Sequence, residues 1–88
     1  DPLISIIIPS FNQGSYLEET ILSVIQQDFS DFEVIIIDGG STDNSVSIIK
    51  KYSEHIAYWV SEADNGQAHA INKGLAVAKG KWINYLNS

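Results

Sequence analysis

Residues 32–37 read FEVIII and are followed by Asp38 and two glycines, and this stretch decides the fold class. A second run of the same kind, at residues 3–8, is closed by Pro9, and weaker runs span residues 56–60 and 82–86. Short, β-branched and nearly continuous apolar runs are typical of strands buried on both faces of a parallel sheet. The sequence therefore predicts four strands of this kind.

Segments of helical periodicity separate the four runs. The first segment has an apolar stripe made of Leu17, Ile21, Val24 and Ile25. Ser15, with Glu18 three residues later, predicts a capping box and a helix that begins near Tyr16. The sequence thus predicts an amphipathic helix between the first two strands.

Two further helices are expected. The second begins after Ser41 or Thr42 and turns Val46 and Ile49 inward. The third places one apolar face inward and ends before Gly80, which we expect to be its left-handed stop. That face consists of Ala68, Ile71, Leu75 and Ala78.

The predicted order is β-α-β-α-β-α-β, a Rossmann-like three-layer α/β/α half-domain with a parallel sheet, and residues 1–88 form one domain. Right-handed crossovers bring the carboxyl ends of all strands to one rim of the sheet, where ligands bind in open α/β folds. The candidate functional segments are therefore residues 9–14, 38–43, 62–67 and whatever follows Leu86.

Composition excludes several classes of protein. The 88 residues include no Cys, which rules out disulfides and thiolate metal sites, and the formal net charge of −6 argues against nucleic acid as a partner. No apolar run approaches the roughly 20 residues that a membrane-spanning helix needs. We expect an excised piece of a larger cytoplasmic protein, peripheral at the membrane, whose bare sheet edges allow self-association.

The first rim segment contains Ser10, Phe11 and Asn12 but no GxGxxG fingerprint, so a pyrophosphate cradled on the first helix is not expected. Its ring, hydroxyl and amide could stack on a base and bind the edge of that base. The alternative is an ordinary turn in which Phe11 packs into the core and Asn12 bonds the loop backbone. The local sequence favours the turn.

The second rim segment offers two interpretations of Asp38. Its carboxylate could accept a hydrogen bond from a base or a ribose, and Gly39 and Gly40 would let a ligand approach closely. Alternatively, Asp38 caps the loop, and residues 41–43 merely start the next helix. Both interpretations stay open for Asp38.

The third rim segment leads into Asn72, which we expect to be buried beside Gln67 and Ala68 and to need a partner. Four acids are expected to project toward the rim, with Lys73 as the nearby cation. These acids are Asp38, Asp43, Glu62 and Asp64. Because they would repel a phosphate, a phosphate-bearing ligand would require a divalent cation.

Five strings in this order resemble the start of a family 2 nucleotide-sugar glycosyltransferase of the GT-A fold. They are residues 6–12 (IIIPSFN), 36–43 (IIDGGSTD), 62–67 (EADNGQ), 70–74 (AINKG) and 80–88 (GKWINYLNS). Each string alone is weak, but together they cover nearly the whole chain in the right spacing.

The resemblance implies a site for a nucleotide-sugar, usually a UDP-sugar. Its residues would be Pro9, Ser10, Phe11, Asn12, Asp38, Gly39, Asp64, Gly66, Gln67, Asn72 and Lys73. Many members have a second acid at the position of Gly39, and that acid often contacts the base. The chain departs from those members there and also has no Arg.

The resemblance also implies a parent enzyme that transfers the sugar, with inversion, to a hydroxyl of a glycan or lipid-linked acceptor in polysaccharide or glycan biosynthesis. Its Mn²⁺ or Mg²⁺ would be held by an acidic motif expected just after Ser88, and the catalytic base would follow further on. The chain itself then contains no catalytic residue and no metal ligand, and is expected to be inactive alone. The alternative is a non-catalytic nucleotide-binding or interaction module; a receiver-like domain is disfavoured because no acid follows the first strand.

Overall fold

The computed structural model describes residues 4–12, 14–26, 31–63 and 66–86. Its strands are β1 (Ile4–Ser10), β2 (Phe32–Asp38), β3 (Tyr58–Ser61) and β4 (Trp82–Tyr85). Its helices are α1 (Gly14–Ile25), α2 (Ser45–Lys51), a 3₁₀ turn at Ser53–His55, and α3 (Gln67–Val77). The α/β class and the alternating order predicted from the sequence are confirmed.

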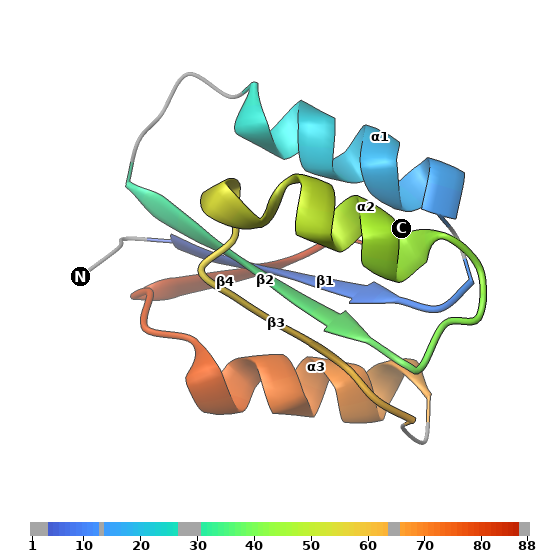
Figure 1. Ribbon diagram of the computed structural model, residues 1–88. Helices are drawn as coiled ribbons and strands as arrows, with labels where there is room; N and C mark the ends of the chain where they lie inside the picture. The colour runs from blue at the N-terminus through green and yellow to red at the C-terminus, as the bar shows by residue number, and fades with distance from the viewer. Residues whose placement is uncertain (1–3, 13, 27–30, 64–65, 87–88) are drawn as a thin grey trace.

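The strands form one parallel sheet in the order β3-β2-β1-β4. Figure 1 shows three layers, with α1 and α2 on one face of the sheet and α3 on the other. Because all strands run the same way, their carboxyl ends meet at one rim, as the right-handed crossover rule requires. Within the described residues, no helix has the length and apolar character needed to cross a membrane.

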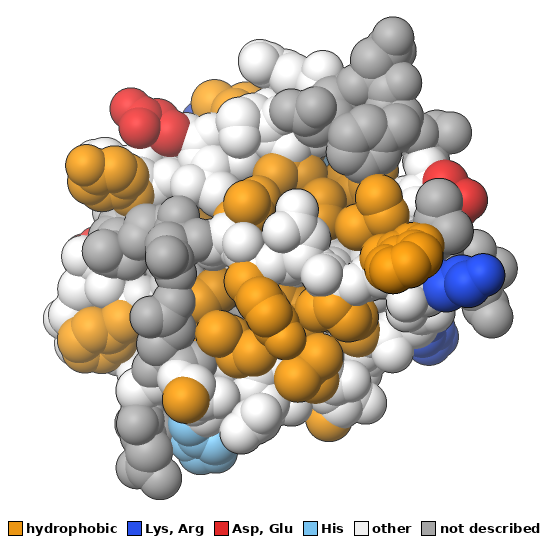
Figure 2. Space-filling model, turned by 180° about the vertical axis from the view of Figure 1, so that it is seen from behind, with side chains coloured by type: hydrophobic (Ala, Val, Ile, Leu, Met, Phe, Trp, Pro, Cys, Tyr) orange, Lys and Arg blue, Asp and Glu red, His pale blue; other side chains and the backbone are white. Residues whose placement is uncertain are grey.

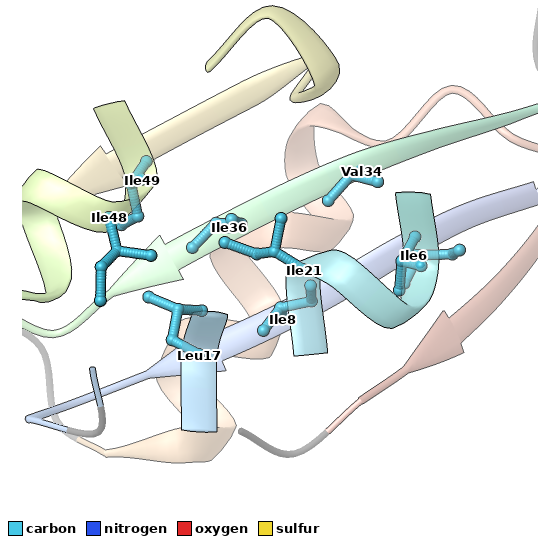
Figure 3. Packing of buried hydrophobic residues seen from close by; sticks show 9 residues of the cluster. Ile6, Ile8, Leu17, Ile21, Val34, Ile36, Ile48 and Ile49 are labelled. Atoms are coloured by element: carbon cyan, nitrogen blue, oxygen red, sulfur yellow. The ribbon is translucent and has the colours of Figure 1, made fainter. Parts of the chain in front are cut away.

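The larger core lies between the sheet and the helices α1 and α2. Ile6 and Ile8 of β1 alternate with Ile7, so they face this side and pack against Leu17 and Ile21 of α1 (Figure 3). The apolar stripe predicted for α1 is therefore confirmed. Fully burying one such side chain stabilises a fold by about 1.5–3 kcal/mol, so this cluster contributes strongly to the stability of the fold.

The helix starts predicted from capping signals are wrong in two places. Ser15 lies inside α1, which begins at Gly14, and the Glu18 carboxylate accepts hydrogen bonds from Lys51 and Tyr52 instead of closing a capping box. The second helix begins at Ser45, because the preceding residues are used in the rim loop described below.

The inward face of α3 is shifted by one position from the prediction. Ala70 and Gly74 are buried against the sheet, whereas Ala68 and Leu75 are exposed. A Cβ at Gly74 would lie 2.7 Å from Cγ2 of the buried Ile7, so the close approach of α3 to β1 selects the glycine side of the helix. This packing outweighs the periodicity of the larger apolar residues.

Gly80 is not the left-handed stop that the sequence suggested, because its φ is not positive. Glycine is required at position 80 for a different reason, because a Cβ there would lie 2.5 Å from the backbone nitrogen of Ser5. The Gly80 N–H donates to Ser5 Oγ (2.7 Å), and Ser5 Oγ donates to Glu33 Oε2 (2.6 Å). Glu33 Oε2 also accepts from the Lys79 N–H, so this network fixes the loop that leads into β4.

The prediction that all four strands are buried on both faces is wrong for the two edge strands: β3 has no buried residue, and β4 is more exposed still. All four residues of β4 are exposed, and Trp82 remains 63% exposed, because β4 has only β1 as a neighbour. β4 lies behind β1 in Figure 1, and the view from behind shows apolar side chains gathered in the middle of that face (Figure 2).

Candidate functional site

The rim at the carboxyl ends of the strands is built around a row of three polar residues. Ser10 of β1 pairs in register with Asp38 of β2, and Asp38 pairs with Ser61 of β3. Parallel strands carry residues in register on the same face, so these side chains stand side by side at the ends of the strands. The row joins the first two predicted rim segments to the end of β3.

Asp38 is fully buried, and its carboxylate accepts three hydrogen bonds. Oδ2 accepts from the Ser41 N–H and from Ser61 Oγ, both at 2.8 Å, and Oδ1 accepts from Ser41 Oγ at 2.6 Å. A buried carboxylate requires such donors, since an unpaired one costs several kcal/mol or shifts its protonation. The arrangement matches the interpretation in which Asp38 caps its loop, while a contact with a base stays a prediction.

The glycines after Asp38 shape this loop. Gly39 donates its N–H to the Ser10 carbonyl (2.8 Å), which continues the pairing of β1 and β2 past their last residues. Gly40 has φ +84°, a conformation that glycine adopts without strain, and a Cβ there would lie 3.3 Å from the Ala63 backbone nitrogen. The loop therefore turns tightly beneath the segment that follows β3.

Asp43 connects the starts of two helices. Its Oδ1 accepts from the N–H and hydroxyl of Ser45 in the first turn of α2, and its Oδ2 accepts from the Gly14 N–H at the start of α1. The hydrogen bonds from Ser45, reinforced by that from Gly14, lower the pKa of Asp43 below its ordinary value. The first N–H of α1 is thus already paired with a carboxylate, an arrangement that the helix dipole favours.

Phe11 projects from the loop between β1 and α1, and 58% of its surface is exposed. The prediction that Phe11 packs into the core is therefore wrong. Its neighbour Asn12 does bond the loop backbone, as the same interpretation expected, because its Oδ1 accepts from the Thr42 N–H. The structure thus places an exposed aromatic ring at the carboxyl end of β1, directly after Ser10.

Other predicted site residues lie at different depths. Pro9 and Ser10 are buried in β1, and Ser10 Oγ has no hydrogen-bond partner in the part of the chain that is described. Asn72 is exposed, so the predicted burial of its amide is wrong: it lies on the outer side of α3 once Ala70 and Gly74 face the sheet.

The third rim segment is only partly visible. Gly66 precedes α3 with φ +105°, and Gln67 is the first residue of the helix. Asp64, the side chain of Gln67, and the end of the chain at Asn87 and Ser88 lie outside what the structure describes.

The expected excess of unpaired acid at the rim is not found among the described acids. Asp38 and Asp43 are held by the donors above, and Glu62 forms an ion pair with Lys73 (3.0 Å), whose side chain is only 21% exposed. Residues 4–12, 14–26, 31–63 and 66–86 contain no group of three or more His, Asp or Glu that could hold a metal ion. These residues do not fit a metal centre by themselves.

Sequence reasoning missed Ser41 and Ser61, both of which bind Asp38. A serine at a strand end carries no signal of its own; only the register of β2 and β3 shows that Ser61 faces Asp38. The predicted helix start gives Ser41 no role at the rim, whereas its hydroxyl joins Asp38 to the backbone of Asn12.

Comparison with known proteins identifies the class. Residues 5–88 match the glycosyl transferase family 2, and the chain belongs to that family. An uncharacterized glycosyltransferase of Haemophilus influenzae is 40% identical over 99% of this chain, which spans 36% of that relative's length.

Solved structures of longer proteins share this fold. Residues 1–349 of S. aureus TarS, in complex with UDP, match 98% of the chain with a TM-score of 0.86 and 30% identity. Mannosyltransferase PcManGT of Pyrobaculum calidifontis, in complex with GDP-Man and Mn²⁺, matches 93% of it with a TM-score of 0.84 and 30% identity. The chain covers 27% and 26% of these two structures, respectively. The GT-A glycosyltransferase fold expected from the sequence is confirmed.

Proposed function

We propose that a protein containing this chain transfers a sugar, with inversion, from a nucleotide-sugar donor to a hydroxyl of a glycan or lipid-linked acceptor in polysaccharide or glycan biosynthesis. Residues 1–88 would bind the nucleotide part of the donor. The observation that carries the proposal is the exposed Phe11 ring at the carboxyl rim of the sheet, in a loop that is hydrogen-bonded through Asn12 to the loop that follows β2. Membership of the transferase family supports the class of reaction.

A nucleoside suits the chemistry of this rim. An exposed aromatic ring provides a stacking surface for a base, and such stacking contributes about 1–3 kcal/mol per base. The related structures with bound UDP and GDP-Man support a nucleoside diphosphate as the common element, and we favour a UDP-sugar.

We include a divalent cation, Mn²⁺ or Mg²⁺, in the proposal. The presence of Mn²⁺ in the PcManGT complex supports it. Because the described residues form no ligand set, we assign no metal ligand and no catalytic base to them. When bound, such a cation would neutralise the charge of the diphosphate.

The proposal is tested by calorimetric titration with UDP and GDP, with and without Mn²⁺. We expect saturable binding that Phe11→Ala weakens and that Trp82→Ala leaves unchanged. Trp82 is a matched control because it is an aromatic residue of similar exposure, 63%, at the opposite end of the strands. Equal losses in both variants, or no binding to the wild-type protein, would contradict the proposed site.

A non-catalytic nucleotide-binding or interaction module is the second candidate. The observation that favours it is that Asp38, Asp43 and Glu62 are all engaged by other residues of the chain. Release of UDP from UDP-sugars in the presence of an acceptor and Mn²⁺ separates the two candidates, since a binding module would bind UDP without any turnover.

We also propose self-association and a cytoplasmic location, peripheral at the membrane. The edge strand β4, with Trp82, Ile83 and Tyr85 exposed, supports pairing with a second copy. Sedimentation over a range of concentrations tests the pairing, and a strict monomer at the highest concentration would contradict it. Fractionation of cells into soluble and membrane material tests the location.

A further inference from the structure

Asn12 has an unusual backbone conformation directly after the exposed Phe11. Its φ is +50°, and it is the only non-glycine residue in the described part of the chain with a positive φ. Asn is one of the few residues that adopt this left-handed conformation at low cost. The chain therefore turns sharply at Asn12, immediately after the ring that we assign to base stacking.

The side chain of Asn12 holds the neighbouring loop. Its Oδ1 accepts from the Thr42 N–H at 2.8 Å and from the Asp43 N–H at 3.4 Å. Both donors are backbone groups that cannot act as acceptors, so they fix which end of the amide is the oxygen. The oxygen of Asn12 thus faces the backbone of the rim loop.

The backbone of Asn12 is held by the same loop. Its N–H donates to Ser41 Oγ at 2.8 Å, and Ser41 Oγ in turn donates to the buried carboxylate of Asp38 at 2.6 Å. On the other side of Phe11, the Ser10 carbonyl accepts from the Gly39 N–H at 2.8 Å. Both neighbours of Phe11 are therefore tied to the loop that follows β2.

We propose that Asn12 is a positioning residue that fixes Phe11 for stacking on the base and does not itself bind the nucleotide. The inference rests on the proposed function. Because most of the Phe11 ring is exposed, the ring is held mainly by the backbone on its two sides. A ring fixed before binding loses less conformational entropy when the base arrives, and this raises affinity without adding a contact.

Two substitutions at Asn12 separate its backbone conformation from its hydrogen bonds. Asn12→Gly keeps the positive φ and removes the acceptor, whereas Asn12→Asp keeps an oxygen acceptor and removes the amide donor. We expect Asn12→Gly to weaken UDP binding about tenfold, the range given by ordering one side chain. Measured with uridine, which has no phosphate for the added carboxylate to repel, Asn12→Asp should retain the wild-type affinity, because the Thr42 and Asp43 N–H groups keep their acceptor.

A double variant tests whether Asn12 affects nucleotide binding by positioning the Phe11 ring. If Asn12 acts through the ring, Phe11→Ala with Asn12→Gly binds UDP no more weakly than Phe11→Ala alone. If the two losses add, or if Asn12→Asp loses as much affinity for uridine as Asn12→Gly, then Asn12 contacts the nucleotide directly and the inference is wrong.

A measurement without nucleotide keeps the inference separate from the proposed function. We expect the Thr42 amide hydrogen to exchange about fivefold faster in Asn12→Gly than in the wild-type protein, the effect of one lost hydrogen bond, and at the wild-type rate in Asn12→Asp. Unchanged exchange in Asn12→Gly would overturn the inference, whatever the protein binds. Faster exchange in a protein that binds no nucleotide would support the loop contact and refute the proposed function.

Discussion

Replacing Asp38 by Asn tests the central support of the rim with almost no change of shape. The Asn oxygen must take the place of Oδ2, because the Ser41 N–H there can only donate. The new NH₂ group then faces Ser41 Oγ, which already accepts from the Asn12 N–H and has to turn its own proton away from Asp38. One hydrogen bond reverses, and the other two lose their charged acceptor.

The expected decrease in the free energy of unfolding follows from these changes in hydrogen bonding. Hydrogen bonds to charged groups contribute about 1.5–3 kcal/mol and neutral ones about 0.5–1.5 kcal/mol, so weakening two of them costs about 2 kcal/mol. The loss is reduced because a buried charge is removed at the same time. With a urea dependence of roughly 1 kcal/mol/M for a small domain, the unfolding midpoint should fall by about 1–2 M.

The assay is urea unfolding followed by tryptophan fluorescence and circular dichroism. Ser61→Ala is the matched control: it removes one donor to Asp38 Oδ2 and leaves the Ser41 N–H in place, so it should cost about 1.5–3 kcal/mol, the contribution of one hydrogen bond to a charged group. A wild-type midpoint for Asp38→Asn would refute the supporting role. If Asp38→Asn kept the wild-type urea midpoint but lost its affinity for UDP, Asp38 would instead be a direct contact to the base.

Three further predictions concern other parts of the chain. Phe11→Ala should weaken nucleotide binding by about 1–3 kcal/mol and leave the urea midpoint unchanged, since its ring is mostly exposed; calorimetry with parallel unfolding checks both, and a destabilised variant would contradict the exposed position. Gly80→Ala should destabilise the fold, because a Cβ at Gly80 would lie 2.5 Å from the Ser5 backbone nitrogen; a wild-type urea midpoint would contradict this reason. Hydrogen bonds hold the pKa values of Glu18 and Asp43 below their ordinary values of 4.5 and 3.8. The stability that these two carboxylates contribute is therefore present above those values and is lost as the pH falls through the folded pKa. Carboxyl NMR titration checks this, and ordinary pKa values would contradict both hydrogen-bond networks.

The sequence was informative where one local pattern determined the outcome. Continuous β-branched runs predicted β1 and β2, and the stripe from Leu17 to Ile25 predicted the buried face of α1, because burial of apolar area dominates there. The rim followed from topology alone, since parallel strands bring residues 9–14 and 38–43 together.

The remaining errors have a common physical cause, which is contact between segments distant in the sequence. The start of α2 is delayed because residues 41–43 bind Asn12 and Gly14, and no local capping signal shows this. The face of α3 is set by the fit of Gly74 on Ile7, and Gly80 is required by its closeness to Ser5. Such contacts depend on register and approach distance, which residue types alone do not specify.

The measurement that tests the nucleotide site most directly is a backbone amide NMR titration of the protein with UDP. We predict that chemical-shift changes concentrate in residues 9–12 and 38–43, saturate with UDP, and are lost in Phe11→Ala. Absence of saturable changes, or changes centred at the opposite end of the sheet around Ser5, Lys79 and Trp82, would contradict a nucleotide site at the carboxyl rim.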